Sequence, residues 1–126
     1  MKTNQEILNL FGGYVGSDAF DSSYGSIVEI LNGTCPNLLM KDKIELFDRF
    51  TGKEKEIIKN YIYDLISGTI FDFLRVFEEH PEFKIIYEEK GQQVDLNKIS
   101  EMLKAEPIIE NGWIQRFSQE LKSKKL

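Results

Sequence analysis

The chain has almost none of the side chains that build disulfides and metal sites. Among its 126 residues there is one cysteine, Cys35, and one histidine, His80. A single cysteine cannot form a disulfide within the chain, and a single histidine cannot complete a zinc or non-haem iron site. The scarcity of thiols favours a reducing compartment, and we predict neither a metal nor a cofactor.

Segments that enter or cross a membrane are also lacking. No run approaches the roughly 20 consecutive apolar residues that span a bilayer. The first six residues are mostly polar and do not resemble the apolar core of a signal peptide. These absences predict a cytoplasmic protein with no membrane partner.

The chain contains fewer basic residues than acidic ones. Lys and Arg number 16 against 21 Asp and Glu, which gives a formal net charge of −5. Such a surface repels a phosphate backbone, so we predict no nucleic-acid partner. The one basic concentration is Lys122, Lys124 and Lys125, which is typical of a solvated helix end. With only three prolines and 41% hydrophobic residues, the chain predicts a single folded domain over 1–126.

No arrangement typical of catalysis is apparent. Cys35 and His80 lie far apart in the chain, and a dyad would need the fold to bring two loop residues together. His80 follows two glutamates, but consecutive helical residues point in different directions. Gly12 and Gly16 are not followed by the lysine and hydroxyl residue of a phosphate-binding loop. We therefore predict no catalytic residues.

The first third of the chain predicts two helices with a break between them. Thr3 and Glu6 have the spacing of a capping box, so the first helix begins there. The glycines that follow weaken it and predict a break near Gly16, before a second helix over 18–32. Because β-branched residues cluster over 26–31, a short strand there is the alternative.

The longest predicted element is a helix that begins at Thr51. Thr51 and Glu54 form a second capping-box pair, and no proline follows until Pro81. Apolar residues come in pairs along this helix, and so wide an apolar face predicts packing on several sides. Gly68 in its middle predicts the close approach of another helix. A shorter helix over 39–50 precedes it.

The pattern changes after the long helix. Residues 83–88 predict a strand, Gly91 a tight turn and 92–94 a return strand. Two short helices follow, capped by Asp95 and Asn111. The predicted fold class is therefore mainly α (α+β), a compact helical domain around one long central helix with a small β-hairpin.

Carboxylates crowd around the predicted hairpin. Five glutamates fall within twelve residues, with aromatic side chains among them. Such a face attracts a basic partner and pairs with its Lys and Arg side chains, while the rings supply anchors. A merely solubilising surface, with the rings in the core, is the alternative. The predicted partner-binding residues are Glu78, Glu79, Glu82, Phe83, Tyr87, Glu88 and Glu89.

Several segments of the C-terminal half carry a family resemblance. They are 66–74 (ISGTIFDFL), 77–79 (FEE), Asp95-Leu96 with Ile99-Ser100, and Asn111-Gly112-Trp113-Ile114 with Phe117-Ser118. In this pattern the chain resembles small acidic immunity proteins of bacterial polymorphic and contact-dependent toxin systems. The resemblance implies a non-catalytic cytoplasmic protein that occludes the active site of a basic toxin domain, such as a nuclease.

Two other functions stay open. A small-molecule-binding protein or an enzyme would have a pocket between the long helix and the hairpin, with Asp64, Asp72 or His80 as its polar groups. A homodimer would pack its exposed aromatic side chains against each other. The sequence does not decide between a monomer and a homodimer.

Overall fold

The computed structural model describes residues 1–123, which are mainly helical with one two-stranded antiparallel hairpin. This confirms the predicted fold class. In chain order the elements are α1 (Asn4–Tyr14), the π-helix η1 (Val15–Phe20), α2 (Asp21–Asn32), the 3₁₀ helix η2 (Leu38–Met40), α3 (Lys41–Asp48), α4 (Gly52–Glu79), β1 (Ile86–Glu89), β2 (Gln92–Asp95), α5 (Leu96–Ile99), the 3₁₀ helix η3 (Leu103–Ala105), α6 (Trp113–Phe117) and α7 (Gln119–Ser123).

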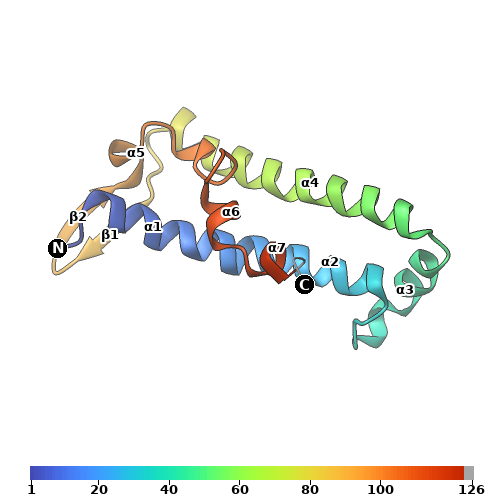
Figure 1. Cartoon of the computed structure of the whole chain (residues 1–126). Coiled ribbons are helices and arrows are strands. Elements are labelled where there is room, and N and C mark those ends of the chain that lie inside the picture. Colours follow the sequence, from blue (N-terminus) through green and yellow to red (C-terminus); the bar gives the residue numbers. More distant parts are fainter. Residues whose placement is uncertain (124–126) are drawn as a thin grey trace.

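Two long helical rods run antiparallel along the molecule (Figure 1). The elements α1, η1 and α2 follow one another directly and form the N-terminal rod, and α4 is the other rod. The C-terminal segment crosses from one to the other, with η3 packed on α4 and α6 packed on α1 and η1. The hairpin and the N-terminus lie at one end of the rods, and α3 lies at the opposite end. In the described part of the chain, no helix is both long enough and apolar enough to span a bilayer.

The predicted break near Gly16 is wrong, because η1 continues the helix through it. Buried residues recur every four positions along this rod: Leu8, Gly12, Gly16, Phe20 and Tyr24. Four residues of an α-helix turn about 40° more than a full circle, so a regular helix would carry these residues off one face. A π-helix has more residues per turn than an α-helix, so it rotates less per residue and keeps these residues closer to one face. The alternative strand over 26–31 is also wrong, since these residues lie in α2.

The predicted starts of both rods are confirmed. The hydroxyls of Thr3 and Thr51 accept hydrogen bonds of 3.1 Å from the backbone N–H groups of Glu6 and Glu54. In return, the two glutamate carboxylates accept from the threonine N–H groups, which completes both capping boxes. The bonds from Thr3 also lower the pKa of Glu6, because they stabilise its ionised form.

The long helix α4 is present as predicted, but it is covered on one side only. Ser67 and Leu74 are its only fully buried residues among those described. Five large apolar side chains are 43% to 63% exposed: Ile57, Tyr61, Leu65, Phe73 and Val76. The expected packing on several sides is therefore wrong. The close neighbour expected at Gly68 is also absent, since no atom lies within 4 Å of the place where a Cβ would stand.

The core consists of two buried clusters that meet at α6. Trp113 belongs to the first cluster, with residues of α1, α4 and α5, and its ring meets Phe11 edge-on with centroids 5.6 Å apart. The next residue, Ile114, belongs to the second cluster, where Phe20 stacks on Tyr24 with centroids 5.2 Å apart. Because two consecutive residues enter different clusters, α6 ties the two halves of the core together.

The C-terminal helices are shorter than predicted. Asp95 does cap α5, accepting a 3.0 Å bond from the Asn97 N–H, but α5 makes only one turn. Asn111 is not the cap of α6; its φ is 58°, and Gly112 occupies the N-cap position. Of the predicted basic tail, Lys124 and Lys125 lie outside the described residues.

Candidate functional site

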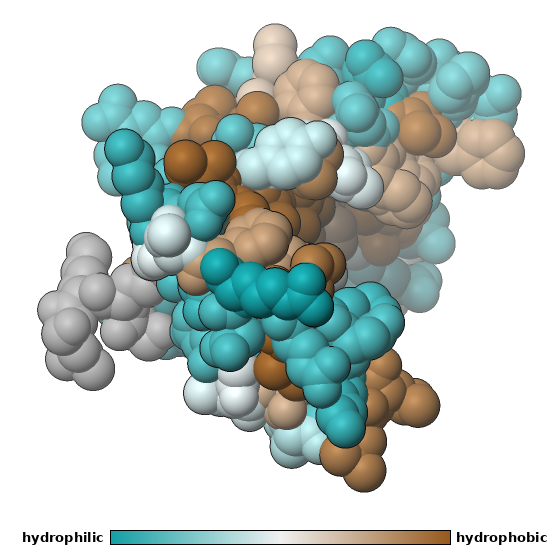
Figure 2. All heavy atoms as spheres, turned by 90° about the vertical axis from the view of Figure 1, so that its right-hand side faces the viewer, coloured by the Kyte–Doolittle hydropathy of each residue, from teal (hydrophilic) through white to brown (hydrophobic). Residues whose placement is uncertain are grey.

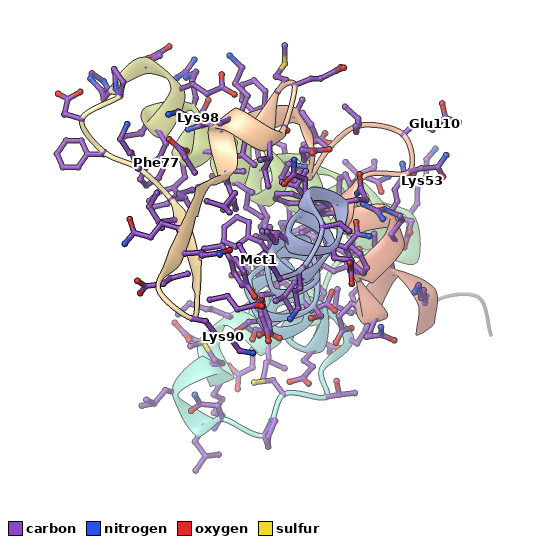
Figure 3. All side chains as sticks on the ribbon, turned by 90° about the vertical axis from the view of Figure 1, so that its left-hand side faces the viewer. Met1, Lys53, Phe77, Lys90, Lys98 and Glu110 are labelled. Atoms are coloured by element: carbon purple, nitrogen blue, oxygen red, sulfur yellow. The ribbon has the colours of Figure 1, made fainter. Side chains whose placement is uncertain are left out.

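The predicted hairpin is present at one end of the molecule, but its first strand is Ile86–Glu89 and not 83–88, because residues 83–85 have no strand partner. Tyr87 lies opposite Val94, and Glu89 lies opposite Gln92. The turn residues Lys90 and Gly91 both have positive φ, 50° and 81°, as in a two-residue type I′ turn. Figure 3 looks onto this end and shows Lys90 at the tip of the hairpin.

Two of the predicted binding residues on β1 are engaged within the chain. The Glu89 carboxylate lies 3.4 Å from the N-terminal amine of Met1 and 3.8 Å from the Lys2 Nζ. It also accepts a hydrogen bond from the Tyr87 hydroxyl. This bond lowers the pKa of Glu89 and raises the pKa of Tyr87, because it stabilises the carboxylate and the protonated phenol. Tyr87 is half-buried against the first core cluster, so it is a poor anchor for a partner.

The two glutamates at the end of α4 are also paired. Glu78 is half-buried, and its carboxylate lies 3.1 Å from the Lys104 Nζ and accepts from the Lys104 N–H at 3.3 Å. Glu79 is exposed and lies 3.7 Å from the Arg75 Nε one turn back along α4. Glu78 therefore fastens η3 to α4, whereas the exposed pair of Glu79 is weak and easily exchanged.

Three predicted binding residues are open to solvent. The Phe83 side chain is 60% exposed. Glu82 and Glu88 are exposed, and neither forms an ion pair with any residue of the described chain; Glu88 accepts only a 3.5 Å bond from the Gln93 amide. We call Glu79, Glu82, Phe83 and Glu88 the hairpin-end face, because their side chains are accessible there.

A prediction follows for the contacts of Glu89. Since its pKa is lower in the folded chain than the ordinary value of about 4.3, its contribution to stability is present above that pH. It is lost as the pH falls through the folded pKa. Glu89→Gln should therefore weaken amide-exchange protection of the hairpin at neutral pH and abolish its loss in acid. The variant should also lower the pKa of Tyr87 towards its ordinary value, which a phenolate absorbance titration measures.

Glu88→Gln is the matched control for that experiment. It removes a carboxylate from the same strand, but one without an ion pair in the described residues. If both variants changed hairpin protection equally, the contacts of Glu89 would not be what holds the hairpin.

A cleft of 380 Å³ lies between the end of α4 and the hairpin, where the alternative hypothesis expected a pocket. Phe77 and Lys98 are among its lining residues and lie near the base of the hairpin in Figure 3. None of the three polar groups expected there lines the cleft, since Asp64, Asp72 and His80 are exposed outside it. The cleft therefore lacks the predicted chemical groups.

Five charged side chains line this cleft, and three of them, Glu78, Lys84 and Asp95, are already in ion pairs. Lys84 lies 3.8 Å from Asp95, and Glu78 holds Lys104. An ion that is already paired offers less to a small ligand than an unpaired one. A ligand that used these three side chains would have to break their pairs, whereas Lys98 and Glu101 line the cleft and form no ion pair among the described residues.

Neither a Cys–His dyad nor a metal site can be assembled from the described residues. Cys35 precedes η2 and His80 follows α4, so they lie at opposite ends of a helix of about 42 Å. They cannot form a dyad. Residues 1–123 contain no group of three or more His, Cys, Asp or Glu side chains placed to hold a metal ion.

Comparison of the chain with protein-family models, curated proteins and solved structures finds no match. The function proposed below therefore has its support in the geometry of this molecule and in the resemblance described above.

Proposed function

We propose that this protein is a non-catalytic protein-binding module, an immunity protein that neutralises a basic toxin domain by covering its active site. The observation that supports this most is the hairpin-end face, where the exposed Phe83 ring lies in a segment with open carboxylates on both sides, Glu82 and Glu88. A ring is a typical interface anchor, and carboxylates attract and orient a basic partner. The net charge of −5 acts in the same direction at longer range.

The mechanism is occlusion and needs no chemical step. The hairpin is held in place before binding by the contacts of Glu89 with the Met1 amine and Lys2. Such a preformed surface loses little conformational entropy when it binds. Lys and Arg side chains of the toxin would pair with Glu82 and Glu88, and its active site would lie beneath the face.

Reversing three charges of the face tests this proposal. The tagged protein is first used to capture its partner from host lysate at low salt, and a basic partner should be released at about 0.5 M salt. With that partner, Glu79→Lys, Glu82→Lys and Glu88→Lys together should slow association about 10- to 100-fold at low salt and flatten its salt dependence. Stopped-flow fluorescence measures both quantities.

A second triple variant controls for net charge. Asp42→Lys, Glu45→Lys and Asp48→Lys lie in α3 at the opposite end of the rods, and each triple changes the formal net charge from −5 to +1. Far-ultraviolet circular dichroism should show an unchanged fold in both. An equal effect of the two triples would leave only a net-charge effect, and an unchanged rate in the first would rule out the hairpin-end face.

A further inference from the structure

Three apolar depressions lie in a row along the N-terminal rod, the first facing the hairpin and the other two facing α4. The first, of 170 Å³, lies between α1 and the hairpin and shares Phe11 and Ile85 with the second, of 310 Å³. The second shares Ala19, Thr69 and Ile70 with the third, of 320 Å³. Because neighbouring depressions share lining residues, they form one continuous groove, which we call the apolar trough.

All residues that line the apolar trough are uncharged. Three of its large side chains are more than half exposed: Tyr14 at 57%, Leu65 at 51% and Phe73 at 63%. Figure 2 looks along the rods from the α3 end and shows hydrophobic atoms in the middle of the view as well as at its right-hand edge. A contiguous apolar surface of this kind is typical of an interaction site.

The two helical segments that border the apolar trough, its walls, contain acidic residues but no basic ones. Residues 3–40, which include the whole N-terminal rod, contain Glu6, Asp18, Asp21 and Glu29 but no Lys, Arg or His. On the other wall, residues 60–74 of α4 contain Asp64 and Asp72 and again no basic residue.

The basic residues nearest in sequence to the lining segments do not alter this charge. Arg75 follows the lining part of α4, but it is paired with Asp72 and Glu79 at 3.4 and 3.7 Å. Lys84 precedes the lining residues of β1 and is paired with Asp95.

Asp72 is thus already paired, and Asp21 accepts hydrogen bonds from the Ser118 hydroxyl and the Gln119 N–H. The exposed carboxylates next to the lining residues that are left for a ligand are Asp18 in the N-terminal rod and Asp64 in α4.

The dimensions of the apolar trough suit a short helix. Along the N-terminal rod its lining extends from Ile7 to Ser23, about 24 Å at the rise of an α-helix. A helix of about 16 residues has that length. Apolar side chains at positions i, i+4 and i+7 of such a helix would enter successive depressions.

We infer that the apolar trough binds a basic amphipathic α-helix of a partner protein. The apolar side of that helix fills the depressions, and its flanking Lys and Arg side chains meet Asp18 and Asp64 on the two walls. A second copy of this chain fits less well, since it would place acidic rods against acidic walls. This surface differs from the hairpin-end face, so the inference does not depend on the proposed function.

A designed peptide tests the inference without knowledge of the partner. The probe is a fluorescein-labelled Leu/Lys peptide of about 16 residues with leucines at helical spacing, and fluorescence anisotropy at about 0.1 M salt measures its binding. The full-length protein should bind it with a Kd of about 1–10 μM. Replacing every lysine of the probe by glutamate should weaken binding about 100-fold or more.

Two double variants of α4 locate the binding site. Leu65→Gln with Phe73→Gln removes two lining side chains and should weaken binding about 10-fold or more. Ile57→Gln with Tyr61→Gln changes equally exposed side chains of the same helix outside the apolar trough, and binding should stay within about 2-fold. All four side chains are exposed, so both variants should keep the wild-type circular dichroism.

Three results would overturn the inference. The first is an equal loss of affinity in the two double variants. The second is equal binding of the lysine and glutamate peptides, which would remove the role of the acidic walls. The third is a molecular mass that doubles with concentration in sedimentation and no longer does so in Leu65→Gln with Phe73→Gln, because a second copy would then occupy the apolar trough. None of these results bears on the hairpin-end face, which is tested separately.

Discussion

Trp113→Ala should lower the free energy of unfolding by about 3–5 kcal/mol, the usual range for an aromatic residue removed from a core. Trp113 is 0% exposed and is the largest of the fully buried side chains described. Its ring fills the space between α6 and α1, where it meets the Phe11 ring and lies over Gly12. Gly12 offers no side chain to close the cavity that alanine would leave. Trp113 is the only tryptophan, so the variant has no tryptophan fluorescence with which to follow unfolding. Urea unfolding monitored by far-ultraviolet circular dichroism therefore measures the loss.

Trp113→Phe is the informative control for that substitution. The indole Nε1 is buried without a hydrogen-bond partner in the described structure, so phenylalanine removes a donor that gains nothing from burial. We therefore expect a loss of only about 1–2 kcal/mol, from the smaller ring volume. A loss as large as that of Trp113→Ala would mean that the indole N–H is satisfied or that ring shape dominates this cluster.

Gly16→Ala and Gly68→Ala should change stability in opposite directions. Each puts alanine in place of glycine inside a helical rod, which by itself stabilises a helix by about 1 kcal/mol. At Gly68 the new Cβ has no neighbour within 4 Å, so the protein should gain that amount. At Gly16 the Cβ would lie 2.8 Å from the Trp113 carbonyl oxygen and 2.9 Å from the Phe117 Cβ. Overpacking of this kind costs about 1–3 kcal/mol or more, so this variant should be less stable.

The midpoints of urea unfolding curves of the two variants and the wild type show whether the two stability changes have opposite signs. Both variants keep the net charge and add one methyl group, so any difference in sign comes from the surroundings of the two glycines. Stabilisation by Gly16→Ala would show that α6 does not lie as close to η1 as described here.

The features predicted correctly from the sequence depend on residues close together in the chain. A capping box joins residues three positions apart, as in Thr3 with Glu6, and the hairpin turn is set by two neighbouring residues. Gly16 was misread because glycine favours both a helix break and the close approach of a second segment, and only the position of Trp113, nearly a hundred residues later, decides between them. The four-residue spacing of apolar or small residues from Leu8 to Tyr24 is the sequence signal for a continuous, wider helix.

In the candidate site, too, features set by neighbouring residues could be predicted from the sequence, and features set by distant residues could not. Alternation along β1 turns Tyr87 and Glu89 towards the body of the molecule and leaves Glu88 exposed, which the strand period could have predicted. The engagement of Glu78 with Lys104, by contrast, joins residues 26 positions apart through the tertiary fold. The apolar trough was missed for a similar reason: a wide apolar face on α4 predicts burial, but nothing local says whether the chain supplies the cover.

The π-helix η1 also has a consequence at the level of the coding sequence. One codon inserted into an α-helix rotates everything after it by about 100°, which in the N-terminal rod would turn Phe20 and Tyr24 away from the core. A π-helical turn holds an additional residue without that rotation, and its removal lets the turn tighten into an ordinary α-helix. Val15–Phe20 is thus the place in this rod where a codon can be lost while the residues on either side keep their partners. An insertion or deletion in the α-helical part between Leu8 and Val15 would instead rotate the residues of one core cluster relative to those of the other.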